Sequence, residues 1–425
     1  MEQAMPSRKR FVRGFAFVGA MAILTAGCTF SWAALRGGAD RTGFSQENDT
    51  GSLSTANVTS VHAVFSVPIP GISDNVQFND ANAQNEQTPP AVAANASFVT
   101  GVFVNGIDGY LHAFDLGGHA RWRVATTGQP TDLAPTPAMS GNAVIVAFGT
   151  PGGSTLAAYN APNGTLLWSH ALAESISARA GAPAVDGNMV YVANGERVSQ
   201  FNVNGTFVRD YTTAQTPITA PVAVANGALF IGTQAGGLLA ENIVNGTEMW
   251  RYGCADPDGC NETDGVAVSG SSVVMSRHNG HVKMLSTGTD GVNAGGIVIW
   301  VAQNPATDNP DIDRVQPVIA YGKVYLATQS GALTALDLNT GAQVWRTPVV
   351  WRPKALAVSN GVLFSTDPLR AYDAGTGAPL AKILKTPIGL DFEGAAAQGT
   401  DVVIADHAIW QINADGTLWK FGIGS

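Results

Sequence analysis

Gly331–Arg346 reads GALTALDLNTGAQVWR, and variants of this phrase recur along the whole chain. Each copy begins with a hydrophobic run, passes through a turn that contains Gly, Asn or Asp, and continues into a segment that usually carries Trp. Successive turns are about 35–50 residues apart, a spacing typical of repeat architectures. The clear copies are Gly109–Arg123, Ser154–Ser169, Gly237–Arg251 and His407–Lys420, and the weaker copies are Arg197–Asp210, His281–Val301 and Leu369–Lys382.

The sequence pattern of each repeat predicts four short strands joined by tight turns. A small-residue segment near proline comes first, as at Pro317–Ile319, and a turn with Gly or Asn follows it. The segments Val324–Thr328 and Leu333–Asp337 come next, and the Trp segment closes the unit. The segments have the two-residue period of strands, and no stretch after residue 27 has the period of a substantial helix.

Eight such units predict an all-β fold, an eight-bladed β-propeller of four-stranded antiparallel blades over residues 57–425. One blade cannot bury both of its faces, so the blades stack, and closing the ring removes the terminal faces. The recurrent tryptophans are expected to pack between neighbouring blades, because an aromatic ring buries a large area. They are Trp122, Trp168, Trp250, Trp300, Trp345 and Trp419.

The repeats leave two ways to close the ring, because two terminal segments are candidates for the same outer strand. Asn57–Ile69 alternates enough to be a strand, and Thr417–Phe421 is the Trp segment of the last copy. Together they give one outer strand more than eight blades can hold. We expect both termini in the last blade, with one of these two strands as an extra edge.

The composition agrees with a β-rich fold and argues against one class of partner. The chain of 425 residues contains 49 Gly and 22 Pro, which indicates many turns, and its hydrophobic content of 45% suffices for a large core. The net charge is −9. Because proteins that bind nucleic acid usually carry a basic stripe, a nucleic-acid partner is not expected.

Residues 1–27 have the features of a signal peptide for export. The basic segment Arg8–Arg13 precedes the apolar run Phe15–Leu24, which is too short to span a bilayer comfortably. The sequence LTAGC at Leu24–Cys28 is similar to a bacterial lipobox, although its Leu lies one position further from the Cys than usual. It predicts lipidation of Cys28, and ordinary signal cleavage after Ala33 is the alternative. Residues 28–56 are expected to form a tether and lead-in.

The other two cysteines lie close together in CADPDGC. In an exported protein, Cys254 and Cys260 most simply form a disulfide, and two reduced surface thiols are the alternative. Cys28 is then the odd cysteine, and lipidation gives it a use. The closed loop is short, so the disulfide is expected to hold a local turn rather than to stabilise the whole fold.

Carboxylates around this cysteine pair form a candidate metal site. Asp256, Asp258 and Asp264 are closely spaced, with Asn261 and Glu262 between them, and Ca²⁺ prefers such oxygen ligands. The spacing fits no EF-hand loop, and a solvated polar loop is the alternative. A second weak metal pair is His278 with His281, for which a turn before a strand is the alternative.

A second acidic loop, Asp308–Arg314, is a candidate contact for a partner. Inserted propeller loops are usual places for protein contacts. The residues concerned are Asp308, Asp311, Asp313 and Arg314.

The copies resemble the PQQ-type propeller repeat, whose pattern is roughly G-x-L-x-A-L-D-x-x-T-G-x-x-x-W, and Gly331–Trp345 matches it nearly throughout. If the resemblance extended to PQQ-dependent quinoprotein dehydrogenases, it would imply bound PQQ with Ca²⁺, a vicinal cysteine pair, Ca²⁺ ligands and an Asp base. This chain has no adjacent cysteines, and those roles map onto no motif here. Because the repeat is a structural module, we expect no cofactor and no catalysis, and keep the dehydrogenase or a ligand-binding propeller as the alternative.

The order of parts is similar to the BamB-type scaffold lipoprotein family of the outer-membrane barrel-assembly machinery. Ile312–Arg314 before Gln316–Val318, followed by GALTALDLNTG, resembles one blade of that family. The resemblance implies a non-catalytic lipoprotein that binds another envelope protein, anchored in the outer membrane and facing the periplasm. Thr29 after the Cys lacks the Asp that would retain it at the inner membrane. The lead-in Trp32–Gly43 and the loop Gly71–Thr88 depart from the family's usual pattern.

Overall fold

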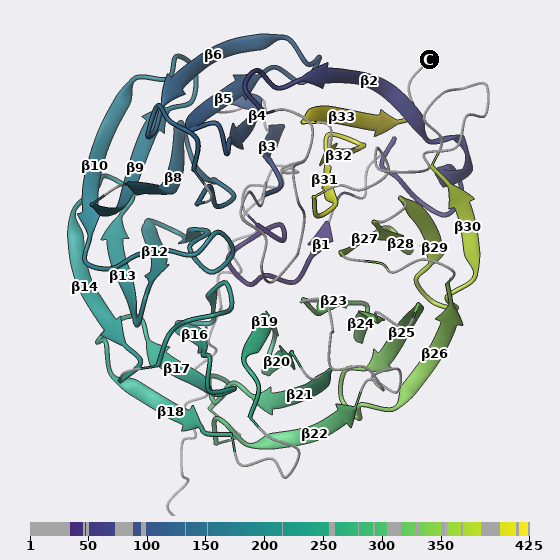
Figure 1. The fold of residues 1–425 in the computed structure, drawn as a ribbon. Coiled ribbons are helices and arrows are strands. Elements are labelled where there is room, and N and C mark those ends of the chain that lie inside the picture. The colour runs from purple at the N-terminus through teal and green to yellow at the C-terminus, as the bar shows by residue number, and fades with distance from the viewer. Residues whose placement is uncertain are drawn as a thin grey trace, which may run out of the picture.

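The computed structural model describes residues 35–45, 47, 51–72, 88–94, 99–131, 133–150, 152–214, 216–254, 260–278, 280–291, 294–303, 316–328, 331–349, 353, 355–366, 369–383, 400–413 and 416–423. In this part of the chain, eight antiparallel sheets stand side by side in a closed ring (Figure 1). The predicted eight-bladed β-propeller is therefore confirmed. No helix in the same ranges is long and apolar enough to cross a membrane.

The first four blades follow one another along the chain, each running from its innermost to its outermost strand. Blade 1 contains β3 (Ala91–Ala94), β4 (Thr100–Asn105), β5 (Tyr110–Phe114) and β6 (Ala120–Ala125). Blade 2 contains β7 (Ala138–Ser140), β8 (Ala143–Thr150), β9 (Gly153–Asn160) and β10 (Leu166–Leu172). Blade 3 contains β11 (Ala184–Asp186), β12 (Met189–Asn194), β13 (Arg197–Asn202) and β14 (Phe207–Thr212), and blade 4 contains β15 (Ala223–Ala225), β16 (Ala228–Gly232), β17 (Leu238–Asn242) and β18 (Glu248–Tyr252).

The remaining blades complete the ring and include the N-terminal strands. Blade 5 contains β19 (Thr263–Ser269), β20 (Ser272–Arg277), β21 (His281–Ser286) and β22 (Val298–Gln303), and blade 6 contains β23 (Val318–Ala320), β24 (Lys323–Thr328), β25 (Ala332–Asp337) and β26 (Gln343–Pro348). Blade 7 contains β27 (Leu356–Ser359), β28 (Val362–Ser365), β29 (Arg370–Asp373) and β30 (Pro379–Lys382), with β1 (Phe44–Ser45) added at its inner edge. Blade 8 contains β31 (Val403–Ala405), β32 (Ala408–Ile412), β33 (Thr417–Gly422) and β2 (His62–Pro68), which the 3₁₀ turn η1 (Val58–Ser60) precedes.

The turn in each repeat is built by its own polar side chains. In blade 6, Oδ1 of Asp337 accepts hydrogen bonds from the backbone N of Thr340 at 2.9 Å and from its hydroxyl at 2.8 Å. These bonds lower the pKa of the Asp337 carboxyl. Gly341 follows with φ of 70°, a conformation that glycine adopts without strain. Residues of the D-x-x-T-G pattern therefore stabilise the hairpin between the third and fourth strands by contacts within the turn itself.

Tryptophans of the outer strands bind five of the blades to the blade that follows. The indole N–H of Trp345 donates to the carbonyl of Ala374 at 3.1 Å, and a Cβ on Gly377 would lie 2.5 Å from the Trp345 ring. Four other tryptophans make the same bond to the following blade at 2.8–2.9 Å, namely Trp122, Trp168, Trp250 and Trp300. The glycine of the repeat thus leaves room for the indole of the preceding blade.

Blade 8 closes the ring with strands from both ends of the chain, as expected. β2 pairs antiparallel with β33, so β33 is the third strand of the blade and β2 is the fourth. The expectation of an extra edge strand is therefore wrong, and Trp419 lies on β33 rather than on an outer strand. Phe65 of β2 takes the outer position instead, because a Cβ on Gly118 of blade 1 would lie 2.5 Å from its ring. Trp419 is still buried, with 7% exposed.

Candidate functional site

The centre of the ring holds a segment of the chain's own N-terminal region. Residues Leu35–Ser45, which we call the channel segment, lie among the innermost strands (Figure 1). Its backbone carbonyls accept hydrogen bonds from one amide each of blades 4, 5, 6 and 7, at 2.7–3.0 Å. The pairs are Val224 N to Ala39 O, Val268 N to Asp40 O, Ile319 N to Thr42 O and Val358 N to Gly43 O.

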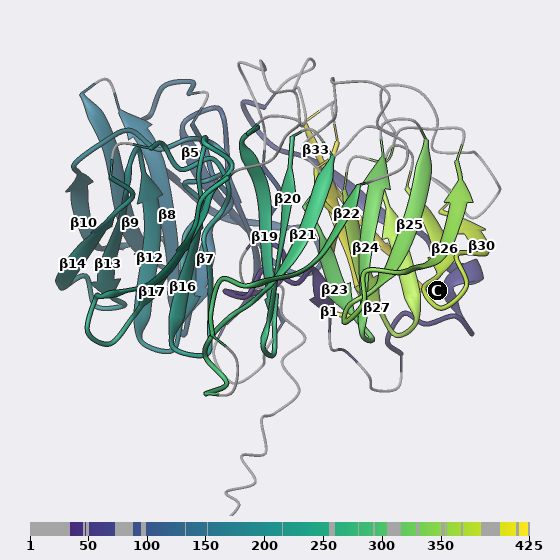
Figure 2. The same cartoon turned by 90° about the horizontal axis from the view of Figure 1, so that it is seen from below.

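This segment was expected to be part of a tether and lead-in, and the structure places its described part inside the propeller. It ends in β1, which pairs parallel with the innermost strand β27 of blade 7. Seen from the side, β1 lies near one face of the ring (Figure 2). That face carries the turns between the first and second strands of the blades, since Val224, Val268 and Ile319 lie close to those turns.

Two arginines fix the channel segment to the propeller. The guanidinium of Arg41 donates to the carbonyls of Val222, Ala182, Pro183 and Leu35 at 2.8–3.1 Å. Only 1% of Arg41 is exposed. These carbonyls, apart from that of Leu35, stand just before the innermost strands of blades 3 and 4, so one side chain holds two blades to the segment.

Arg36 makes the corresponding contacts on the other side of the channel. Its guanidinium donates to the carbonyls of Pro317 at 2.8 Å, Leu356 at 3.2 Å and Gln316 at 3.4 Å, at the start of blades 6 and 7. A Cβ on Gly43 would lie 2.7 Å from the Arg36 guanidinium, and Gly43 has φ of 67°. Glycine is therefore required at position 43 on both counts.

Both guanidinium groups stay charged at neutral pH, although burial lowers their pKa. Desolvation lowers the pKa of Arg36 and that of Arg41 to about 10 each, while Asp401 and Asp40 respectively act in the opposite direction. The channel segment thus brings two cations into the propeller, and the carbonyl dipoles of the innermost strands compensate for their lost hydration.

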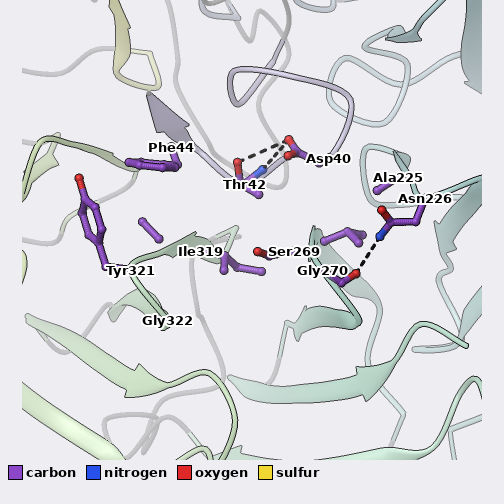
Figure 3. Close-up of a pocket in the computed structure, with 12 residues that line it drawn as sticks. Asp40, Thr42, Phe44, Ala225, Asn226, Ser269, Gly270, Ile319, Tyr321 and Gly322 are labelled. Carbon is purple, nitrogen blue, oxygen red and sulfur yellow. Dashed lines mark hydrogen bonds between the residues drawn. The ribbon is translucent and has the colours of Figure 1, made fainter. Parts of the chain in front are cut away.

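A small pocket lies where the channel segment meets the turns of blades 4, 5 and 6 (Figure 3). Its volume is about 290 Å³, and Asp40 is the one charged residue that lines it. Oδ1 of Asp40 lies 3.4 Å from both the backbone N and the hydroxyl of Thr42, and burial raises the pKa of this carboxyl. Phe44 and Tyr321 meet edge to face on another side, with ring centroids 5.1 Å apart.

Among the described residues, the groups that the channel segment brings to the centre of the ring do not match a site for PQQ with Ca²⁺. A cofactor site needs convergent polar groups that are available to the ligand. The cationic groups that the channel segment contributes, those of Arg36 and Arg41, are instead bonded to backbone carbonyls. Two buried cations also disfavour a bound divalent cation by charge repulsion. The sequence has no adjacent cysteines.

One group of potential metal ligands occurs in the described part of the chain, at the opposite end of β19 from the contact with the channel segment. It consists of Glu262, Asp264 and His278, whose ligand atoms lie within 4.8 Å of one another. The Nδ1 of His278 is 3.3 Å from Oδ2 of Asp264. Two residues of the predicted oxygen-rich loop, Glu262 and Asp264, belong to this group, and Asp256 and Asp258 lie outside the described residues. His281, on β21, is not part of the group.

The predicted disulfide between Cys254 and Cys260 is confirmed. It closes the connection that leads from β18 to β19, so it holds the chain just before Glu262. The other candidate residues lie outside the described part of the chain, and no structural statement is made for them. They are Cys28 and the acidic-loop residues Asp308, Asp311, Asp313 and Arg314.

Sequence reasoning missed the role of the two channel arginines and a buried contact between a histidine and an aspartate. In blade 1, Nε2 of His112 lies 3.0 Å from Oδ2 of Asp108, and both side chains are buried. The alternation of apolar and polar residues in the sequence gives no sign of this contact between His112 and Asp108. The arginines did leave a signal, because Arg36 and Arg41 lie in the compact motif RGGADRTG directly before the first strand.

Two curated relatives each match part of the chain. Tetrathionate hydrolase of Acidithiobacillus ferrooxidans is 27% identical over 237 residues, which are 53% of this chain and 41% of that protein. Outer membrane protein assembly factor BamB of Yersinia pestis is 26% identical over 207 residues, 44% of this chain and 51% of that protein. The chain thus matches about half the length, or less, of these relatives.

A solved structure and a family model extend the comparison to most of the chain. The quinohemoprotein alcohol dehydrogenase ADHIIG from Pseudomonas putida HK5 superposes with a TM-score of 0.67 at 13% identity, over 93% of this chain and 80% of that one, which shows a shared fold. The model of the family described as "Outer membrane protein assembly factor BamB" matches residues 79–212 and 193–373, more than half of the chain. With its eight PQQ-type blades, this chain belongs to that family.

Proposed function

We propose that the protein is a non-catalytic scaffold of the cell envelope that binds another envelope protein. The observation that carries this proposal is the channel segment. It occupies the centre of the propeller, where a cofactor or substrate of a propeller enzyme would need free polar groups, and it bonds its arginines to the ring itself. What remains for function is the outer surface and the loops, which suit protein contacts.

The family match also supports a location in the cell envelope for this chain. A family described as an outer membrane protein assembly factor is consistent with export, with lipid attachment at Cys28 and with an outer-membrane anchor that faces the periplasm. The acidic loop at Asp308–Arg314 is our proposed contact with the partner, because an acid-rich insert steers a basic surface into place.

An enzyme is the second candidate, and one comparison favours it. The match to a protein named tetrathionate hydrolase covers 53% of this chain. The group of Glu262, Asp264 and His278 is the described cluster that resembles a reactive site. Against a quinoprotein dehydrogenase are the filled channel and the missing vicinal cysteines.

The decisive experiment compares binding and turnover in one preparation. The purified protein is incubated with PQQ and Ca²⁺ and assayed for dye-linked oxidation of alcohols and sugars. In parallel, the native lipoprotein is recovered from its own membrane, and the proteins that accompany it are identified by mass spectrometry. We expect a specific envelope partner and no turnover. Quinone-dependent turnover would refute the scaffold proposal.

The position of the contact has its own test. A variant neutralised at Asp308, Asp311 and Asp313 should recover less of the partner. The matched control neutralises three acids of blades 3 and 4, Asp186, Glu196 and Glu248, and should recover as much partner as the wild type. Equal recovery by both variants would refute the placement of the contact and leave the scaffold proposal standing.

A further inference from the structure

The outermost strand of each blade ends its sheet, so one of its edges pairs with no other strand of the described chain. In the described residues these outer strands are β6, β10, β14, β18, β22, β26, β30 and β2, each at the end of its sheet. A strand edge presents unpaired N–H and C=O groups, and proteins usually protect such edges with charges or proline. The eight outer strands differ in this protection.

β22 is the least protected outer strand of the described chain, since the other strand without a charge or a proline, β10, at least carries a histidine. It reads VIWVAQ, without a charged residue, a histidine or a proline. Each of the other outer strands carries at least one of these. They have Arg121 and Arg123 in β6, His170 in β10, Arg209 and Asp210 in β14, Glu248 and Arg251 in β18, Arg346 and Pro348 in β26, Pro379 and Lys382 in β30, and His62 and Pro68 in β2.

β22 also exposes an apolar stripe. Ile297, directly before the strand, and Ile299 and Val301 within it are 50%, 51% and 54% exposed. They alternate with Trp300, which is 7% exposed and donates to the carbonyl of Leu338 in blade 6. Trp300 therefore fixes the strand against the next blade and turns the stripe outward. The inner edge of β22 pairs with β21.

We infer that β22 is a docking edge for an extended segment of another protein, which adds to blade 5 as a fifth strand. This inference rests on the proposed scaffold function and names a second contact surface, in addition to the acidic loop at Asp308–Arg314. The main-chain groups of β22 would supply hydrogen bonds, and the stripe of Ile297, Ile299 and Val301 would select apolar residues at alternate positions of the added segment.

A second copy of this chain is a poorer occupant. Three half-exposed aliphatic side chains are a small part of the roughly 1,200–2,000 Å² that a stable protein–protein interface buries. Two copies would also each carry a net charge of −9. An added peptide strand needs less side-chain area, because its affinity comes largely from main-chain hydrogen bonds. The occupant is therefore an extended segment, neutral or basic, with alternating apolar residues.

A defined peptide tests the inference on the purified full-length protein. The probe is a nine-residue, fluorescently labelled peptide in which Val and Thr strictly alternate. A control peptide has the same sequence with every internal backbone nitrogen methylated, so it cannot donate hydrogen bonds. Affinity is measured by fluorescence anisotropy, and hydrogen exchange of the amides of residues 297–303 reports pairing at the edge. We expect slower exchange there with the first peptide and no binding of the second.

Paired variants then locate the binding site. Ile299→Lys places a charge on the β22 edge and should weaken binding at least about tenfold. Leu167→Lys makes the same change at a residue of β10 that is 49% exposed, and should bind as the wild type does. Val301→Lys replaces Ile299→Lys if the latter does not fold, which the melting temperature shows.

Several results would overturn the inference. They are unchanged exchange at β22, equal binding by Ile299→Lys, binding of the methylated peptide, or a wild-type dimer that Ile299→Lys disrupts. The scaffold proposal has a separate outcome. If the wild type recovers a partner from the membrane and Ile299→Lys recovers it equally, the docking edge is wrong and the scaffold stands. If the wild type shows quinone-dependent turnover of an alcohol or sugar, the scaffold proposal fails whatever the peptide does.

Discussion

Replacing Arg41 by methionine should destabilise the whole propeller, although the residue lies outside every blade. Methionine keeps much of the length of the side chain and removes the donors. Carbonyls of Val222, Ala182 and Pro183 in the ring then lose the guanidinium that binds them at 3.0–3.1 Å. The change therefore tests whether the channel segment is a structural part of the ring.

The expected cost follows from these contacts. Each hydrogen bond to a charged group contributes about 1.5–3 kcal/mol, and each buried carbonyl left without a donor costs about 1–3 kcal/mol. The buried guanidinium itself costs several kcal/mol in lost hydration, which the variant recovers. We therefore expect the free energy of unfolding to fall by about 3–5 kcal/mol, the range for breaking a buried charged contact.

Urea unfolding, followed by tryptophan fluorescence, measures this change. Arg251→Met is the matched control, since Arg251 is partly exposed and paired with Glu248 at 2.7 Å, and its loss should cost about 1 kcal/mol or less. Hydrogen exchange at the amides of Val224 and Val268, which bond to the channel segment, should also become faster in Arg41→Met. If Arg41→Met unfolds at the same urea concentration as the wild type, with unchanged exchange at these amides, the channel segment does not hold the ring together.

Three further predictions concern single residues. Trp345→Ala should lower the free energy of unfolding by about 3–5 kcal/mol, as other truncations of large core side chains do. Leu166→Ala, at a site that is 56% exposed, should change it by less than about 0.5 kcal/mol. Similar melting temperatures of the two variants would contradict the packing role of Trp345. Burial, reinforced by Glu248, raises the pKa of Glu241 from 4.5 to about 7, so the folded state loses at most about 3 kcal/mol of stability as the pH rises through this window. Glu241→Gln should therefore be more stable than the wild type at pH 8 and lose this advantage near pH 4.5. A stability difference that does not change with pH would show that Glu241 does not titrate in this way. Cys28→Ser should release the protein from the membrane fraction or stall its processing, and full retention in that fraction would rule out lipid anchoring.

The blades could be predicted from the sequence because the information that forms them is local. Alternation sets the strands, and Asp337 with Thr340 and Gly341 builds its turn from bonds within five residues. The recurrence of Trp345 and its equivalents indicated a repeated contact between blades. The same local information predicted the disulfide of Cys254 and Cys260, since the two residues are close in the chain.

The sequence could not order the strands of the last blade. Asn57–Ile69 and Thr417–Phe421 have the same alternating pattern, and a pattern does not say whether a strand is third or fourth in its sheet. The ring decides this, because β2 must pair with β33 to close it. Phe65 consequently lies where five of the other outer strands carry Trp, and Trp419 lies one strand further in.

The chain by itself thus determined eight units of strands and turns, since these depend on neighbours in the sequence. Only the tertiary structure determined which residues lie in the channel and which side chains the outer strands expose. Arg36 and Arg41 look like charges of a solvated lead-in until the carbonyls of residues as distant as Ala182 and Leu356 converge on them. Whether Ile299 and Val301 are covered or exposed likewise depends on how the outer strands are placed around the ring. Burial of a charge and exposure of an apolar side chain are both set by distant parts of the chain, and no local pattern encodes them.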